Sequence, residues 1–199
     1  MVLLVAILLA LVAGYLTGGS LAHANQARFR ALPLFVGAAV VQVLIFTPLL
    51  GARDFIHEYG SLIYIASVLA SLGAILLNLH IPGMKIMAAG AALNALVIIA
   101  NGGYMPSTEA ALARAGKLEA VERSEAQAPG DDWLLTNSTI ADDDTRLLFL
   151  GDVIAIPEGV PLANVISIGD LLLALGAALA VLRVMHLPAE AAATNSEGG

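Results

Sequence analysis

The sequence predicts an all-α fold, a polytopic integral membrane helix bundle with five transmembrane helices and a long acidic outer loop. The chain of 199 residues is 59% hydrophobic and 13% charged, whereas soluble domains are about 45–50% apolar and about 25% charged. Its apolar residues are grouped into runs close to the ~20 residues that a membrane-spanning helix needs. Most of its acidic residues lie between the fourth and fifth runs.

Five apolar runs define the predicted spans. They cover residues 1–20, 31–50, 61–79, 83–100 and 167–187. No basic segment precedes the first run, which favours a spanning helix over a cleaved secretory signal. Residues 51–60 read as a polar turn. Residues 1–187 therefore form one predicted membrane domain, and residues 188–199 read as a disordered tail.

Polar and small residues recur on one side of the fourth run. Gly83, Gly90, Asn94 and Asn101 are separated by seven and four residues, which places them on one helical face. An unpartnered amide in hydrocarbon is costly. We therefore expect this face to contact other helices and not lipid.

The basic residues of the short connections predict the threading. Arg28, Arg30, Lys85 and Arg183 fall on one side if the N-terminus lies outside, and short cytoplasmic connections are enriched in such residues. We therefore expect a multi-pass protein of the cell membrane with a cytoplasmic C-terminus. The lipid bilayer is its first predicted partner.

The loop over residues 101–166 is predicted to lie outside the membrane. Residues 108–123 have the composition of a short surface helix, and residues 107–146 could dock a protein partner. Residues 147–157 are apolar but only about half the ~20 residues needed to cross. An interfacial or re-entrant segment fits them better, and irregular backbone at membrane depth must be buried in protein or line a wet cavity.

Three motifs give this chain a family resemblance. They are NGGYMP after the fourth run, FLGDVIAIP within the loop, and NVISIGD at the start of the last run. With them the chain resembles a family of small bacterial five-span membrane proteins of unknown function. The resemblance covers nearly the whole chain except residues 107–144, and it implies an integral membrane protein without implying any activity.

The ends of the loop supply a candidate binding pocket on the outer face. It would be built from polar residues beside the fourth and fifth spans and two roofing side chains, namely Asn101, Tyr104, Met105, Asp152, Asn164 and Asp170. An ionisable group at the membrane edge, such as Asp152, is by default a functional hypothesis. The simpler reading of Ser167 and Asp170 is a helix-capping box, and that of residues 101–103 is a helix C-terminus.

Composition narrows the function classes. The chain has no cysteine, its four histidines lie in separate segments, and no metal-ligand, cofactor or nucleic-acid-binding pattern is present. We expect a non-catalytic membrane component or accessory subunit. The alternative is a binder or transporter of a lipid-linked or small polar molecule, although no inverted repeat is visible. An enzyme using Asp152 and Asp170 as an acid/base pair is the least favoured class.

Overall fold

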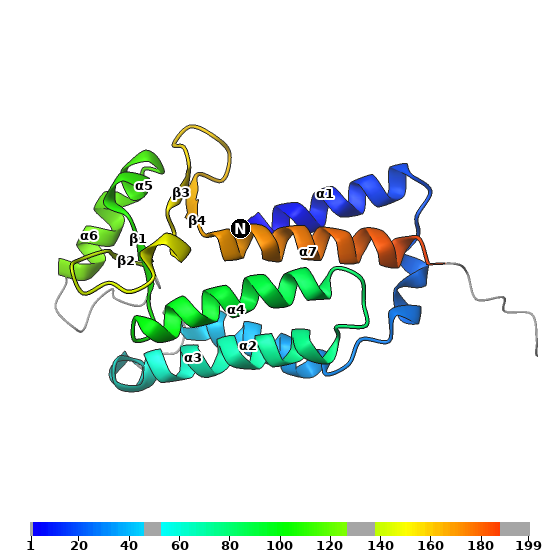
Figure 1. The fold of residues 1–199 in the computed structure, drawn as a ribbon, viewed down its shortest axis with the longest axis horizontal. Coiled ribbons are helices and arrows are strands. Elements are labelled where there is room, and N and C mark those ends of the chain that lie inside the picture. The colour runs from blue at the N-terminus through cyan, green and yellow to red at the C-terminus, as the bar shows by residue number, and fades with distance from the viewer. Residues whose placement is uncertain (1, 46–52, 127–137, 188–199) are drawn as a thin grey trace, which may run out of the picture.

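The computed structural model describes residues 2–45, 53–126 and 138–187. It consists of a bundle of five long helices with a smaller α/β cap at one end (Figure 1). The bundle helices are α1 (Val2–Leu16), α2 (Leu32–Ile45), α3 (Arg53–Leu77), α4 (Met84–Ala100) and α7 (Ile168–Met185). Each runs opposite in direction to the one before it in this series (Figure 1), so the chain passes back and forth along the bundle.

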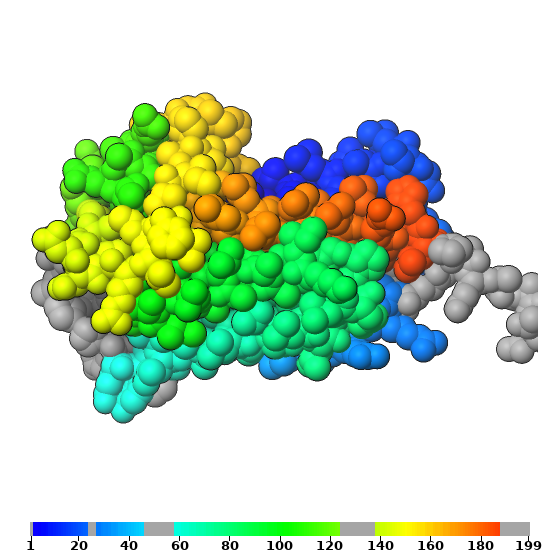
Figure 2. Space-filling view, viewed as in Figure 1, coloured from blue at the N-terminus to red at the C-terminus, as the bar shows by residue number. Residues whose placement is uncertain are grey.

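The closest helix contact is the α4–α7 interface, which we define by Gly83, Gly90 and Asn94 on α4 and its N-cap, and Gly169 and Gly176 on α7. A Cβ at Gly90 would lie 2.5 Å from the Gly169 carbonyl oxygen. A Cβ at Gly176 would lie 2.5 Å from Met87 Cγ. Because side chains are missing at these points, the two backbones approach closely, and α4 and α7 pack side by side along one face (Figure 2).

The predicted polar face of α4 is confirmed for three of its four positions. Gly83, Gly90 and Asn94 all face α7. Asn101 instead caps the C-terminus of α4 and bonds to the chain at Arg146. The helix ends at this point because Gly102 and Gly103 adopt left-handed φ angles of 67° and 101°.

The cap, defined as residues 105–126 and 138–166, combines short helices and strands. Its elements are β1 (Met105–Ser107), α5 (Glu109–Arg114), α6 (Leu118–Ala126), β2 (Ser138–Ile140), the 3-10 turn η3 (Leu148–Leu150), β3 (Ile154–Ile156) and β4 (Asn164–Ile166). Strands β1 and β2 pair in parallel, and β3 and β4 form an antiparallel pair. The cap sits over the end of the bundle where α4 finishes and α7 begins (Figure 1).

The cap has a hydrophobic core of its own. Ala111, Leu112 and Ala115 pack against Val121 and Val165. Thr108 starts α5 by accepting a hydrogen bond from Ala111 N–H. The single predicted surface helix is therefore two helices with a buried side, and Gly116, at φ 63°, separates them.

One sequence-based boundary needs correction. The expected turn at residues 51–60 is helical from Arg53 onward, because this polar stretch contains no proline and continues into the apolar run that follows it. The mainly helical class is confirmed, but the four short strands were not predicted. Residues 147–157 form the turn η3 and strand β3 within the cap. The predicted tail at 188–199 lies outside the described residues.

Two of the described helical segments, Glu58–Leu77 and Ile168–Met185, are long and apolar enough to cross a membrane. Three further helices are apolar but shorter, namely α1, α2 and α4.

The bundle also contains the turn η1 (Leu21–Ala27), which connects α1 and α2 at the end opposite the cap. Ser20 starts it, and its N–H donates a hydrogen bond to the carbonyl oxygen of Met185 at the end of α7. The side chain of Met185 packs onto Gly14 of α1. Helix α7 is therefore the central helix, with α1 on one side and α4 on the other.

Candidate functional site

Asn94, Ser167 and Asp170 form a closed hydrogen-bond network where α7 begins. Asn94 Nδ2 donates to Asp170 Oδ1 over 2.8 Å, and the Ser167 hydroxyl donates to Asn94 Oδ1 over 2.9 Å. Ser167 N–H donates to Asp170 Oδ2 over 3.2 Å, and Asp170 N–H donates to Ser167 Oγ over 2.9 Å. The capping box is therefore present, and α4 extends it with an amide from the neighbouring helix.

The absence of a side chain at Gly169 leaves room for this network. A Cβ at Gly169 would collide with Asn94 Oδ1. Ser167 is completely buried, and the carboxylate of Asp170 lies at the N-terminus of α7, where the helix dipole favours negative charge. The capping box and the hydrogen bond from Asn94 therefore fix the position of the Asp170 carboxylate.

A second carboxyl group, that of Asp152, is held beside the end of β1. Its N–H donates to the carbonyl oxygen of Pro106 over 2.9 Å, and Asp152 pairs with Ser107 in a parallel bridge. Gly151 makes this approach feasible, because a Cβ there would collide with the Pro106 carbonyl oxygen. The segment before β3 is thus attached directly to the chain that leaves α4.

Asp152 and Ser107 are both deeply buried, with 9% and 0% of their surfaces exposed. Within the described residues, neither Asp152 Oδ1 nor Ser107 Oγ has a hydrogen-bond partner. Loss of solvation on burial, together with the negative charge of Asp170, raises the pKa of Asp152 from 3.8 to about 8. At neutral pH the Asp152 carboxyl is therefore mostly protonated and can donate a hydrogen bond.

The sequence predicted six residues around one pocket, and the structure gives each a definite place. Asp152 and Asp170 are electrostatically coupled. Asn101 bonds with the backbone of Arg146, accepting from its N–H and donating to its carbonyl oxygen, each over 2.9 Å. Asn164 pairs with Ile156 in the β3–β4 hairpin.

The two residues expected to form a roof differ from each other. Tyr104 is 39% exposed. Met105 is buried in a cluster with Tyr64, Val97 and Ile98, at the junction of the bundle and the cap.

Sequence reasoning missed Ser107 altogether, whereas it expected Asn94 to form an interhelical hydrogen bond without identifying Ser167 and Asp170 as its partners. Ser107 directly follows the NGGYMP motif, but nothing in the sequence shows that Asp152 becomes its bridge partner. That pairing joins residues 45 positions apart. Among the described residues there is no cluster of three or more acidic or histidine side chains that could hold a metal ion.

The chemistry available here is hydrogen bonding and proton exchange. A neutral carboxyl and a hydroxyl lie in one buried strand pairing, close to a carboxylate whose oxygens already accept bonds from Asn94 and Ser167. Buried polar atoms without partners are uncommon in folded proteins and call for a specific explanation. A small polar molecule or ordered water bonded to either atom would supply it.

One family model matches residues 26–182, and its description is DUF5317, a family of unknown function. No curated protein and no solved structure matches the chain.

Proposed function

The chain belongs to DUF5317, a family of unknown function, and we propose that it is a non-catalytic integral membrane component whose five bundle helices cross the bilayer. The observation that carries this proposal is the outer surface of the bundle. Every bundle helix carries large apolar side chains that are 51–82% exposed, for example Leu16 on α1, Val43 on α2, Leu62 on α3, Leu96 on α4 and Leu175 on α7. Contiguous apolar surface of this kind marks a protein or membrane contact.

The interior of the bundle supports the same proposal. Its buried positions are rich in small residues, including Ala10 and Gly14 on α1, Ala38 on α2, and Ala174 and Gly176 on α7. Membrane helices associate through small residues because lipid chains are as apolar as leucine, so burying large side chains gains little. A water-soluble bundle would have the opposite arrangement.

Helix lengths agree with crossing for α3, α7 and α4. Helix α4 has 17 residues, the lower end of the range of about 17–25 for a spanning helix. Helices α1 and α2 have 15 and 14 residues, and residues 46–52, after α2, lie outside the described part of the chain.

Charge supports an orientation with the cap outside. Four basic residues lie at the bundle end opposite the cap. Arg28 and Arg30 follow η1, Lys85 is near the start of α4, and Arg183 is near the end of α7. We propose that this end faces the cytoplasm, which places the N-terminus outside and the C-terminus inside the cell membrane.

The cap would then be the surface for a protein partner. Helix α6 has a polar side with exposed Glu119, Glu122 and Arg123, while Val121 faces the cap core. A folded outer module on a membrane bundle, with an exposed charged side, suits docking of a partner with complementary charge.

Cysteine labelling tests the proposed threading, since the chain has no cysteine of its own. We expect Glu122→Cys in the cap to react with a membrane-impermeant maleimide in intact cells. His80→Cys, in the exposed turn between α3 and α4, should react only after the membrane is opened. Equal labelling of the two variants in intact cells, or release of the protein by alkaline carbonate, would contradict the proposal.

A second function is supported by Asp152 and Ser107. The two buried atoms without partners favour binding of a small polar molecule that bonds to the Ser107 hydroxyl. Substitution Ser107→Ala should then abolish binding while leaving the cap folded, since the Ser107 hydroxyl has no partner among the described residues. The measurement is a ligand screen by thermal shift on the wild type and on Ser107→Ala, with the melting temperatures of the two proteins without ligand as the control for folding.

A further inference from the structure

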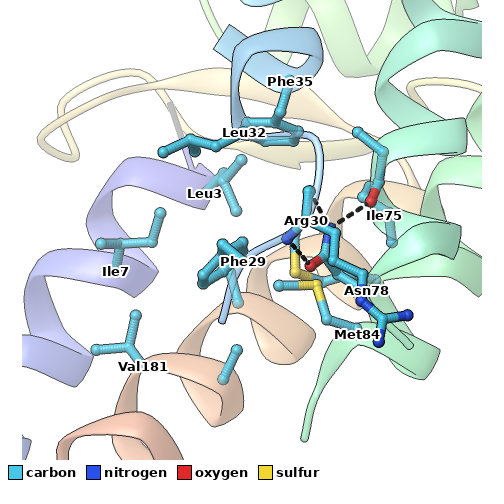
Figure 3. Close-up of a pocket in the computed structure, with 14 residues that line it drawn as sticks. Leu3, Ile7, Phe29, Arg30, Leu32, Phe35, Ile75, Asn78, Met84 and Val181 are labelled. Atoms are coloured by element: carbon cyan, nitrogen blue, oxygen red, sulfur yellow. Dashed lines mark hydrogen bonds between the residues drawn. The ribbon is translucent and has the colours of Figure 1, made fainter. Parts of the chain in front are cut away.

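An apolar cavity of about 220 Å³ lies near the bundle end opposite the cap. It is bounded by α1, α2, α3, α4 and α7. Figure 3 shows Leu3 and Ile7 of α1 on one side, Phe35 of α2 and Ile75 of α3 on another, and Phe29 between them. No bundle helix is missing from its wall, so the cavity is a feature of the whole bundle.

The cavity offers no free polar group to a ligand. Its one buried amide, Asn78, is 3% exposed and fully used. Asn78 Nδ2 donates to the carbonyl oxygens of Arg30 and Ala74, each over 2.7 Å, and Asn78 Oδ1 accepts from Arg30 N–H over 2.7 Å. A sugar, nucleotide or other polar molecule would lose its hydration here without compensation.

The rim of the cavity is exposed and apolar. Phe29, Leu32 and Phe35 line it while keeping 48%, 51% and 37% of their surfaces exposed. The cavity therefore communicates with the apolar outer surface of the bundle near the start of α2. Its volume is below the about 300–1,000 Å³ of sites for drug-sized ligands, which suits a single alkyl chain.

The basic residues at this end of the bundle favour an anionic group at the head of that alkyl chain. Exposed Arg28 and Arg30 lie next to Phe29, and exposed Lys85 follows Met84 of the cavity wall. Arg183 is exposed on α7, two residues after Val181, another wall residue. Among the described residues at this end of the bundle there is no acidic side chain, although the chain as a whole carries a net charge of -7.

The position of Arg30 links the charge to the cavity. Its backbone is fixed to Asn78 by the two hydrogen bonds described above, while its side chain extends away from Leu3 and Ile7 (Figure 3). The Arg30 guanidinium therefore lies outside the apolar cavity, and the neighbouring Phe29 forms part of the cavity rim. An anionic head outside and an alkyl chain inside would match both parts.

We propose that this cavity binds one acyl chain of an anionic phospholipid from the surrounding bilayer, with its phosphate held by Arg28 and Arg30. This inference rests on the proposed membrane location. The shared chemistry is an alkyl chain with an anionic head, which a free fatty acid also has. The bilayer phospholipid is favoured because the cavity opens sideways onto the apolar surface of the bundle.

Retention of lipid by the purified full-length protein tests the proposal. Protein in neutral detergent is mixed with phosphatidylglycerol, phosphatidylcholine or laurate, and bound molecules are counted by native mass spectrometry. We expect phosphatidylglycerol to be retained at least about fivefold better than phosphatidylcholine, and each Arg→Gln change at Arg28 or Arg30 to reduce that retention about fivefold. Arg114→Gln and Arg123→Gln in the cap are matched controls and should change nothing.

Filling the cavity tests the acyl chain separately. Ile7→Trp or Val181→Phe should reduce retention of both phospholipids. Leu4→Trp should not, because the Leu4 side chain is 62% exposed on the outside of α1. Equal retention of the two phospholipids, or no effect of both filling variants, overturns the proposal. Preferential retention of laurate overturns the phospholipid as the source of the chain. Failure of the membrane location is recognised independently, because alkaline carbonate would then release the protein, and this overturns both proposals.

Discussion

The α4–α7 interface and the side of the bundle formed by α2 use opposite packing strategies. On α4 and α7, glycines bring two backbones together and Asn94 bonds across to Ser167 and Asp170. On α2, Gly37 has no neighbouring atom within 4 Å of where a Cβ would lie, and Val36 and Val40 are each 50% exposed. One surface is fitted to a specific partner helix, whereas the other presents exposed apolar side chains, which face lipid under the membrane location proposed above.

This difference shows which sequence features carry structural information. Small residues at the α4–α7 interface are fixed by geometry, because an added methyl group would meet backbone atoms. Under the membrane location proposed above, large exposed residues on α2 face lipid and can be exchanged for one another, since lipid adapts to their shape. The cavity lies where these two regimes meet, with Met84 and Met87 of α4 on one wall and Leu32 and Phe35 of α2 on another.

The largest expected effect comes from widening the α4–α7 interface. Gly90→Leu should destabilise the protein by about 3 kcal/mol or more, because the new side chain meets Gly169 O and the N–H of Leu173 and must force the helices apart. Gly37→Leu on α2 should cost nothing and can gain up to about 1 kcal/mol from helix propensity. Thermal unfolding in detergent measures both, and equal melting temperatures would refute the contrast.

A smaller effect is expected from removing the amide that joins the two helices. Asn94→Ala should cost about 2 kcal/mol, since Asp170 loses a charge-assisted hydrogen bond and the Ser167 hydroxyl loses its acceptor. Asn101→Ala, on the same helix, should cost only about 0.5–1 kcal/mol because its bonds to Arg146 are exposed. If both variants unfold at the same denaturant concentration, the interface amide has no special role.

Much of the bundle could be predicted because helical periodicity is local. The spacing of Gly83, Gly90 and Asn94 identified the side of α4 that faces α7, and the motif from Ser167 to Asp170 identified the start of α7. Apolar runs also located the five long helices, although the polar beginning of α3 hid its first eight residues, 53–60. These features depend on neighbours within one or two turns.

The cap and the cavity could not be predicted for the same physical reason. The pairing of β1 with β2 and of Ser107 with Asp152 joins distant segments, and strands of three residues leave almost no periodic signal. The cavity depends on five helices at once, and none of its wall residues is unusual in an apolar helix. Long-range contacts among ordinary residues are not encoded in spacing.

The smallest expected effect, counted per unit of pH, concerns the pH dependence of stability at the junction of bundle and cap. Burial and the charge of Asp170 raise the pKa of Asp152 to about 8. An acid with a raised pKa binds its proton more tightly in the folded than in the unfolded protein, so stability falls as pH rises from about 4 to about 8. Between pH 6 and pH 7 this amounts to a loss of about 1 kcal/mol. Asp152→Asn keeps the shape without the charge and should remove this slope, making the variant more stable than the wild type at pH 8.

Asp143→Asn, at an exposed position of the cap, is the matched control and should retain the pH dependence of the wild type. Unfolding curves measured across this pH range compare the three proteins. A wild type whose stability does not change from pH 5 to pH 8 would mean that Asp152 is ionised at its buried position, stabilised by a donor or cation bound at its free oxygen.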